Sequence, residues 1–172
     1  MNGPSIAGRR TDGIAPIYTP EQRRRRDSSH WTVVQGVLAP IQFLVFLVSL
    51  ALVLHYLASG RGAAAATISI VTKTGTLYAI MITGSIWEKT VFGKWLFADA
   101  FFWEDLSSML VLGLHSLYLV ALIGGIGNER GRMLLALAAY ASYAVNAAQF
   151  LLKLRVARLQ GAEAPSAMAM TR

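Results

Sequence analysis

The sequence contains no cysteine, and this absence excludes several kinds of site. Without cysteine the chain can form no disulfide, no thiolate-ligated metal centre, no iron–sulfur cluster and no cysteine nucleophile. Phosphate-binding loops, catalytic triads, zinc motifs and dinucleotide fingerprints are also missing. The three histidines, His30, His55 and His115, show no metal-ligand spacing, so we expect no metal held by the protein.

Acidic residues are few, with nine Asp and Glu against sixteen Lys and Arg, which gives a net charge of +7. Such a charge raises the question of a nucleic-acid partner. The basic residues, however, gather at the ends of apolar segments instead of along one solvated face. Membrane topology explains this pattern better, and we predict no nucleic-acid binding.

Four long apolar segments dominate the chain, which is 55% hydrophobic with a mean hydropathy of +0.48. A helix that crosses a bilayer needs about 20 mostly apolar residues. We therefore predict an all-α, polytopic integral membrane protein in which residues 30–159 form a four-helix bundle. The expected spans are at about residues 31–57, 63–87, 102–123 and 133–154. Residues 1–29 are expected to be a basic, mostly disordered arm, and residues 160–172 a flexible tail.

The distribution of Lys and Arg predicts the orientation, because basic residues beside membrane spans are retained in the cytoplasm. Twelve of the sixteen lie in the N-terminal arm, the loop between the second and third spans, or the C-terminal segment. Only three lie in the other two loops. Both termini and the middle loop are therefore predicted to be cytoplasmic. Within the arm, Thr19 and Pro20 can begin a short helix, as its cap and first-turn proline.

Each predicted span carries one polar face, and we expect all four faces to turn toward a shared interior. The alternative is that these side chains only join the helices by hydrogen bonds. Lys73 differs, because an ammonium group at mid-bilayer costs at least about 2.5–3.5 kcal/mol. The four faces consist of Gln35, Gln42, Ser49 and Tyr56; Ser69, Thr72, Lys73, Thr76 and Thr83; Glu104, Ser108 and His115; and Ser142, Asn146, Gln149 and Lys153.

The segment from Thr83 to Met109 is dense in aromatic residues and holds four of the nine acids. Aromatic residues at span ends commonly form an interfacial belt. A carboxyl group beside aromatic surface is desolvated, which favours the neutral form that a general acid needs. Alternatively, Glu88 pairs with Lys89 or Lys94 and Asp99 lies in water. The residues of interest are Trp87, Phe92, Trp95, Phe97, Phe101, Phe102 and Trp103, with Glu88, Asp99, Glu104 and Asp105 among them.

Three stretches of the chain together resemble the 3-vinyl bacteriochlorophyllide hydratase family of bacteriochlorophyll biosynthesis. They read TPEQRRRRDSSHWTVVQGVLAPIQFLVF, TGSIWEKTVFGKWLFADAFFWED and YAVNAAQFLLKLR, and the resemblance covers about Tyr18 to Leu159. It implies addition of water across the C3 vinyl group of a magnesium chlorin or bacteriochlorin, which gives a 1-hydroxyethyl group. It also implies a multi-pass protein of a bacterial inner membrane, cytoplasmic or intracytoplasmic, with no redox cofactor.

The residues suit that chemistry, which needs a buried acid, a base that holds water and an aromatic slot. We expect Glu104 to be the general acid, with Glu88 or Asp105 placing the water. Flat tetrapyrroles favour aromatic faces, and their propionate favours a basic rim such as Lys94 or Arg26. The expected substrate-binding residues are Trp87, Trp95, Trp103, Phe92, Lys94, Lys73, His115, Asn146 and Gln149.

Two other functions use the same features. A non-catalytic pigment carrier or assembly factor would need the aromatic slot and the basic rim but no set of acids. A small channel or proton-coupled transporter would use Lys73 and the polar faces, although no broken-helix pair or inverted repeat is present. The sequence leaves open whether the chain forms a homo-oligomer or associates with other pigment-synthesis enzymes.

Overall fold

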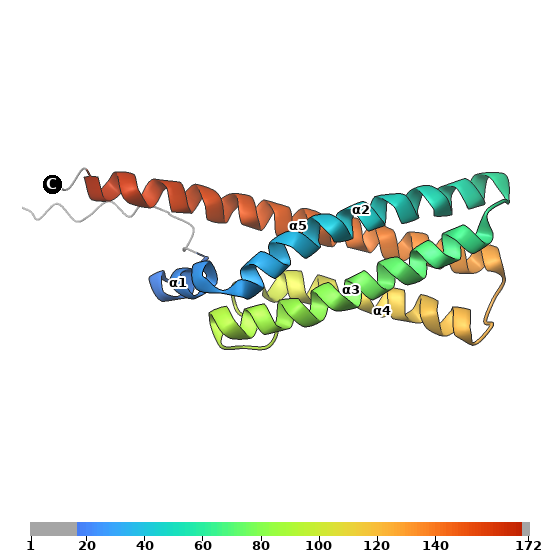
Figure 1. The fold of residues 1–172 in the computed structure, drawn as a ribbon, viewed down its shortest axis with the longest axis horizontal. Helices are drawn as coiled ribbons and strands as arrows, with labels where there is room; N and C mark the ends of the chain where they lie inside the picture. Colours follow the sequence, from blue (N-terminus) through green and yellow to red (C-terminus); the bar gives the residue numbers. More distant parts are fainter. Residues whose placement is uncertain (1–16, 170–172) are drawn as a thin grey trace, which may run out of the picture.

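The computed structural model describes residues 17–169, with side chains described up to residue 158. Within these residues all regular secondary structure is helical, as predicted, and no strand is present. The helices in chain order are α1 (Pro20–Ser28), α2 (His30–Ser59), α3 (Ala63–Phe92), α4 (Phe102–Ile123) and α5 (Glu129–Ala169) (Figure 1). The all-helical class is thereby confirmed.

Four helices, α2 to α5, are long and apolar enough to cross a membrane. α2 and α3 have 30 residues each and α4 has 22. All three reach the length of about 20 residues that a helix needs to cross a 30 Å hydrocarbon core. α3 and α5 extend beyond the predicted spans. α5 continues to Ala169, so most of the predicted tail has a helical backbone, in keeping with the high helix propensity of its alanines.

The short helix α1 begins as its sequence predicts. The Thr19 hydroxyl accepts a hydrogen bond from the backbone N–H of Gln22 at 3.2 Å, and Gln22 Oε1 accepts one from Thr19 N–H at 2.9 Å. Pro20 occupies the first turn, where its missing N–H is not needed. The prediction of a helix at Thr19 and Pro20 is confirmed, whereas residues 1–16 of the predicted arm lie outside the described residues.

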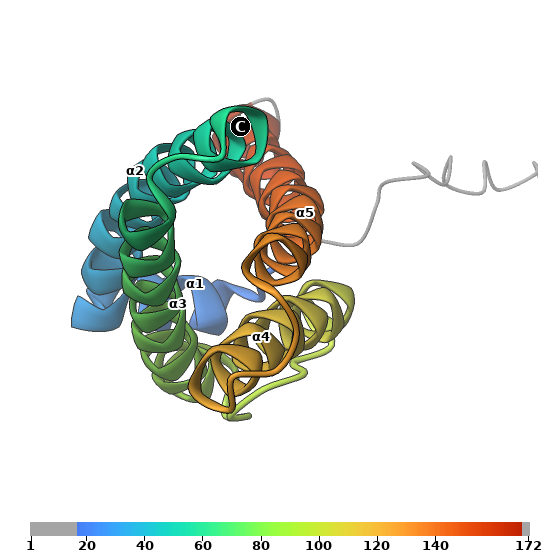
Figure 2. The ribbon, with the colours of Figure 1, turned by 90° about the vertical axis from the view of Figure 1, so that its right-hand side faces the viewer.

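The long helices form two antiparallel pairs, α2 with α3 and α4 with α5 (Figure 1). The α2–α3 turn uses Gly60 and Gly62, at φ 69° and 83°, a backbone region that glycine enters without strain. Seen along the helices, α2, α3, α4 and α5 follow one another around a common centre (Figure 2). Side chains such as Phe46, Ile70 and Tyr118 fill this centre.

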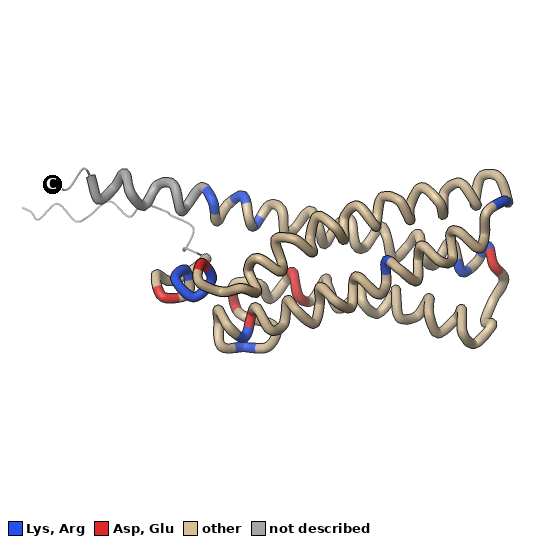
Figure 3. Tube along the Cα trace, viewed as in Figure 1, with Lys and Arg blue, Asp and Glu red and all other residues tan. Residues whose placement is uncertain are grey.

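The polar faces turn toward the centre as predicted, with one exception. Every helix of the four buries polar side chains there, and the charged residues gather mainly toward the two ends of the helices (Figure 3). Thr72 was expected inside but is exposed, and its hydroxyl bonds to Ile68 O in its own helix. Thr74 is buried instead, on the side of Lys73 that faces away from Thr72. The buried polar residues are Gln42, Ser49, Lys73, Thr74, Glu88, Glu104, Asp105, Ser108, His115 and Asn146.

Candidate functional site

Three carboxyl groups are buried together at the end of the helices where the 93–101 loop joins α3 to α4. Glu88 lies in the last turns of α3, and Glu104 and Asp105 lie in the first turn of α4. Their exposed fractions are 3%, 8% and 7%. Acids at a helix N-terminus are favoured by the helix dipole, which suits Glu104 and Asp105. The sequence prediction of desolvated acids in this segment is therefore confirmed.

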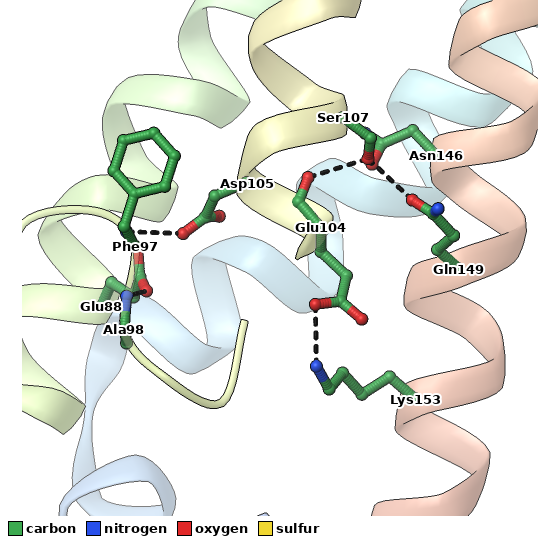
Figure 4. A network of polar contacts seen from close by, with 9 residues as sticks. All are labelled: Glu88, Phe97, Ala98, Glu104, Asp105, Ser107, Asn146, Gln149 and Lys153. Atoms are coloured by element: carbon green, nitrogen blue, oxygen red, sulfur yellow. Dashed lines mark hydrogen bonds and ion pairs between the residues drawn. The ribbon is translucent and has the colours of Figure 1, made fainter. Parts of the chain in front are cut away.

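Glu88 and Asp105 hold the 93–101 loop (Figure 4). Glu88 Oε1 accepts a hydrogen bond from Ala98 N–H at 2.8 Å, and Asp105 Oδ2 accepts one from Phe97 N–H at 2.7 Å. The two carboxyl groups also lie near each other. Phe97 has φ 58°, a value unusual for a residue other than glycine, so these two bonds help hold the loop in an otherwise unfavourable conformation.

Glu104 has a different partner, on α5. Its Oε2 lies 2.7 Å from Lys153 Nζ, and the two side chains are only 11% and 23% exposed. The Lys153 ammonium group also lies 5.0 Å from the centre of the Phe101 ring. Glu104 therefore forms an ion pair with a cation. Glu88 and Asp105 form no ion pair in the described part of the chain.

A hydroxyl–amide network lies one helical turn from this ion pair (Figure 4). Ser107 Oγ is 2.5 Å from Asn146 Oδ1 and 2.7 Å from Gln149 Oε1, and Asn146 Nδ2 donates to Ser108 Oγ at 3.0 Å. Asn146 and Gln149 were predicted as site residues, but Ser107 was not. The spacing could have indicated Ser107, because it follows Glu104 by three residues and so lies about one turn farther along the same side of the helix.

An open groove of about 650 Å³ runs over the surface between α4 and α5 beside this network. Ser107 and Gln149 belong to both the groove and the network. Trp103 is 70% exposed, and its ring packs edge-on against Phe102. The groove is lined by Trp103, Leu106, Ser107, Met109, Leu110 and Gln149.

The three predicted tryptophans do not line one slot. Trp87 is half-buried and packs edge-on against Phe92 and Phe101. Trp95 is 60% exposed and lies beside Lys89 in the loop region, and Trp103 lies on the surface of α4. Equal spacing of eight residues could not bring them together, because the 93–101 loop interrupts the helix between Trp87 and Trp103.

Trp87 and Phe92 belong to an aromatic cluster that attaches α1 to the other helices. Tyr18 stacks on Phe92 with ring centres 5.7 Å apart, and the Arg26 guanidinium lies 4.7 Å from the centre of the Tyr18 ring. Burial raises the pKa of Tyr18, although the nearby Arg26 acts in the opposite direction. Tyr18 is thus a neutral packing residue, and no motif in the sequence marked it.

The basic residues proposed as a rim are separated as well. Lys94 pairs with Asp99 at 2.8 Å on the exposed surface, and Arg26 pairs with Asp27 at 2.7 Å. The alternative prediction that Glu88 pairs with Lys89 or Lys94 is wrong, because the Lys89 ammonium donates to Gly93 O and the Lys94 ammonium is bound to Asp99.

Lys73 and His115 lie together in a second buried region, deeper between the helices. Lys73 is completely buried, with its ammonium 4.0 Å from the centre of the Tyr143 ring, and His115 Nδ1 is 2.8 Å from Val111 O. Neither Lys73 Nζ nor His115 Nε2 has a hydrogen-bond partner within the described residues. In that same part of the chain, no group of three His, Asp or Glu side chains could hold a metal ion.

These features define an all-helical protein with four helices long and apolar enough to span a membrane, and with a set of buried carboxyl groups at one end of its helices. Residues 18–156 match the family of 2-vinyl bacteriochlorophyllide hydratases (BCHF), and the chain belongs to that family. The resemblance seen in the sequence is confirmed, although the family description numbers the vinyl position 2 instead of 3. The chain is accordingly an enzyme of the hydro-lyase class.

Two curated relatives support this assignment. A 2-vinyl bacteriochlorophyllide hydratase of Cereibacter sphaeroides is 62% identical over 144 residues, which cover 83% of this chain and 89% of the relative. A protein of the same name from Rhodobacter capsulatus is 59% identical over 146 residues, which cover 85% of each chain. No solved structure shows a significant match.

Proposed function

We propose that this chain adds water across the vinyl group of a bacteriochlorophyllide and converts it into a 1-hydroxyethyl group. The names of the two relatives support the reaction and the substrate. The structural observation that carries the proposal is the burial of Glu88, Glu104 and Asp105 at one end of the helices. A non-catalytic pigment carrier has no need of three desolvated acids, since each is expensive to bury.

The reaction consists of a proton transfer followed by capture of water. A proton adds to the terminal vinyl carbon, which leaves a positive charge on the inner carbon, where the macrocycle delocalises it. The oxygen of water then bonds to that inner carbon, and the surplus proton of the added water returns to the protein. Overall one water is consumed, and no electron is transferred to or from a cofactor.

Glu104 is the group best placed to carry this proton. The ammonium of Lys153, 2.7 Å away, can supply a proton through Glu104 to the vinyl carbon. The Glu104 carboxylate left behind faces the developing positive charge and stabilises it. It then accepts a proton from the attacking water and passes it to the neutral Lys153 amine, which restores the ion pair for the next cycle.

The network of Ser107, Asn146 and Gln149 is a better holder of the water than Glu88 or Asp105. It is polar, it lies one helical turn from Glu104, and two of its members reach the open groove. Glu88 and Asp105 are occupied by the loop backbone. We assign this pair a supporting role, in which it holds the 93–101 loop at the end of the site.

Lys73 and His115 fit a role in substrate binding less well than the sequence suggested. His115 follows Glu104 by eleven residues, which places it about 16 Å farther along α4. Both side chains are 1% exposed or less and lie among packed aromatic rings. We therefore assign Lys73 and His115 to helix packing.

We further propose that α2 to α5 cross a bacterial inner membrane as a four-helix bundle with both termini in the cytoplasm. The bias of twelve basic residues to three supports this orientation. It places the three acids at the cytoplasmic surface, where water is available. A pigment dissolved in the bilayer can reach the same level from the side.

The proposal can be tested with the purified protein in detergent and a vinyl bacteriochlorophyllide, with no other cofactor added. We expect the absorption band to shift as the vinyl group leaves conjugation, and the product mass to increase by one water. Binding of the pigment without either change would indicate a carrier and would contradict the proposal. Proton transport without any change in the pigment would instead indicate a transporter.

A further inference from the structure

We infer that the macrocycle of the substrate binds in the groove between α4 and α5 and enters it sideways from the bilayer. This inference rests on the proposed function. Tests of it must therefore separate loss of the groove from loss of the reaction. Its basis is the shape of the groove, the character of its two walls and its position relative to Glu104.

The size and the apolar wall of the groove suit a flat aromatic ligand. Its volume of about 650 Å³ falls within the usual range of small-molecule sites, about 300–1,000 Å³. Trp103, Leu106 and Leu110 recur at helical spacing along one face of α4 and are 70%, 46% and 59% exposed. Indole and macrocycle faces can stack on one another, which adds specificity to apolar contact.

One side of the groove is polar and leads to the acid. Ser107 follows Glu104 by three residues on α4, and Gln149 precedes Lys153 by four residues on α5. Both wall residues are therefore one helical turn from the ion pair, on the two helices that carry it. A macrocycle edge against Ser107 and Gln149 would bring a peripheral vinyl group toward Glu104 and the water held by the network.

The other exposed tryptophan supplies a useful contrast. Trp95 is 60% exposed, comparable with Trp103, but its ring lies near Lys89 and does not line the groove. A membrane-facing groove could also hold a lipid acyl chain. If an acyl chain occupied the groove, substitutions in the groove would not change turnover of the pigment. The two occupants therefore predict different kinetics for groove variants.

The test fills the groove with a larger side chain and compares it with a matched position. Leu110→Trp enlarges a residue of the groove, and Leu117→Trp makes the same change seven residues later on the same face of α4, where the side chain is 51% exposed. We expect Leu110→Trp to raise KM for the vinyl pigment by roughly tenfold, with kcat less affected, and Leu117→Trp to leave both near wild type.

An unchanged KM in Leu110→Trp, while the wild-type protein hydrates the pigment, would overturn the inference and would assign the groove to lipid. Equal losses in Leu110→Trp and Leu117→Trp would overturn it as well. If the wild-type protein neither binds nor hydrates the pigment, the proposed function fails instead. Should Leu110→Trp not fold, Trp103→Ala compared with Trp95→Ala tests the same point: only the former should raise KM.

Discussion

The protein has two buried polar regions that satisfy their charges in different ways. At the end near the 93–101 loop, Glu88, Glu104 and Asp105 all have hydrogen-bond or ion-pair partners. Deeper between the helices, Lys73 Nζ and His115 Nε2 have no hydrogen-bond partner among the described residues. The first region thus holds charge and transferable protons, whereas the second tolerates a cation chiefly through the Tyr143 ring.

Burial of an ionisable group therefore does not by itself identify the reacting one. Lys73 is the most deeply buried charged residue of the described chain, yet its Nζ has no hydrogen-bond partner there and it does not line the groove. Glu104 is slightly more exposed, and it combines a cation partner, a nearby hydroxyl–amide network and an adjacent groove. Proton transfer requires such a combination, because acid, water and substrate must meet.

The largest effect is expected at Glu104. Glu104→Gln keeps the size of the side chain but removes the carboxyl group, so turnover should fall by about 10²–10⁴-fold. Asp99→Asn is the matched control, because the Asp99 side chain is 95% exposed and outside the site. Rates of hydroxyethyl product formation should separate the two variants. Undiminished turnover by a folded Glu104→Gln protein would remove Glu104 from the mechanism.

A slightly smaller effect is expected from Lys153→Met. This change leaves Glu104 buried without its cation, which should lower the free energy of unfolding by about 3–5 kcal/mol and reduce turnover. Adding Glu104→Gln should restore much of the stability but none of the activity. Unfolding in mixed detergent measures the free energy of unfolding of each variant. If the double variant is no more stable than Lys153→Met alone, the ion pair is not what holds α4 to α5 here.

Ser107→Ala should have an intermediate effect on rate. Loss of its hydroxyl disturbs the network that places the water, so kcat should fall by about tenfold with little change in KM. Ser116→Ala is the comparison, because that hydroxyl lies on the same helix but bonds to Tyr78, 2.8 Å away. A fall in kcat of the same size in both variants would mean that the network does not place the water.

The smallest effect on turnover is expected at Lys73. Lys73→Met removes a buried amine, which as an ammonium at the centre of a bilayer would cost about 2.5–3.5 kcal/mol, partly offset by about 2 kcal/mol from the aromatic face. Stability should therefore rise by roughly 1 kcal/mol while turnover stays near wild type. A loss of turnover comparable with that of Glu104→Gln would reverse the comparison between the two regions and return Lys73 to the site.

Much of the helical architecture could be predicted from sequence because each span is long, apolar and bounded by turn residues. The inward position of Gln42, Ser49, His115 and Asn146 also followed from spacing alone. Exact helix ends could not, because α5 continues to Ala169 past Gly161 and Pro165, residue types that commonly end a helix.

The candidate site could be predicted only in part. Acids in aromatic surroundings were found from local density, but their partners depend on which helices meet. Glu104 is paired with Lys153, 49 residues away, and Ser107 contacts Gln149, 42 residues away. The prediction of a single slot lined by Trp87, Trp95 and Trp103 is wrong, because the loop between α3 and α4 interrupts the helical spacing of these residues. Sequence periodicity carries no information across such a break.

The most direct test of the central claim follows the atoms of water into the product. Hydration by the purified protein in D₂O enriched in ¹⁸O should give, at early times, one deuterium on the methyl carbon of the new hydroxyethyl group and ¹⁸O in its hydroxyl. The Glu104→Gln variant should incorporate neither. A product without methyl deuterium, or with oxygen that does not come from water, would contradict proton-initiated hydration.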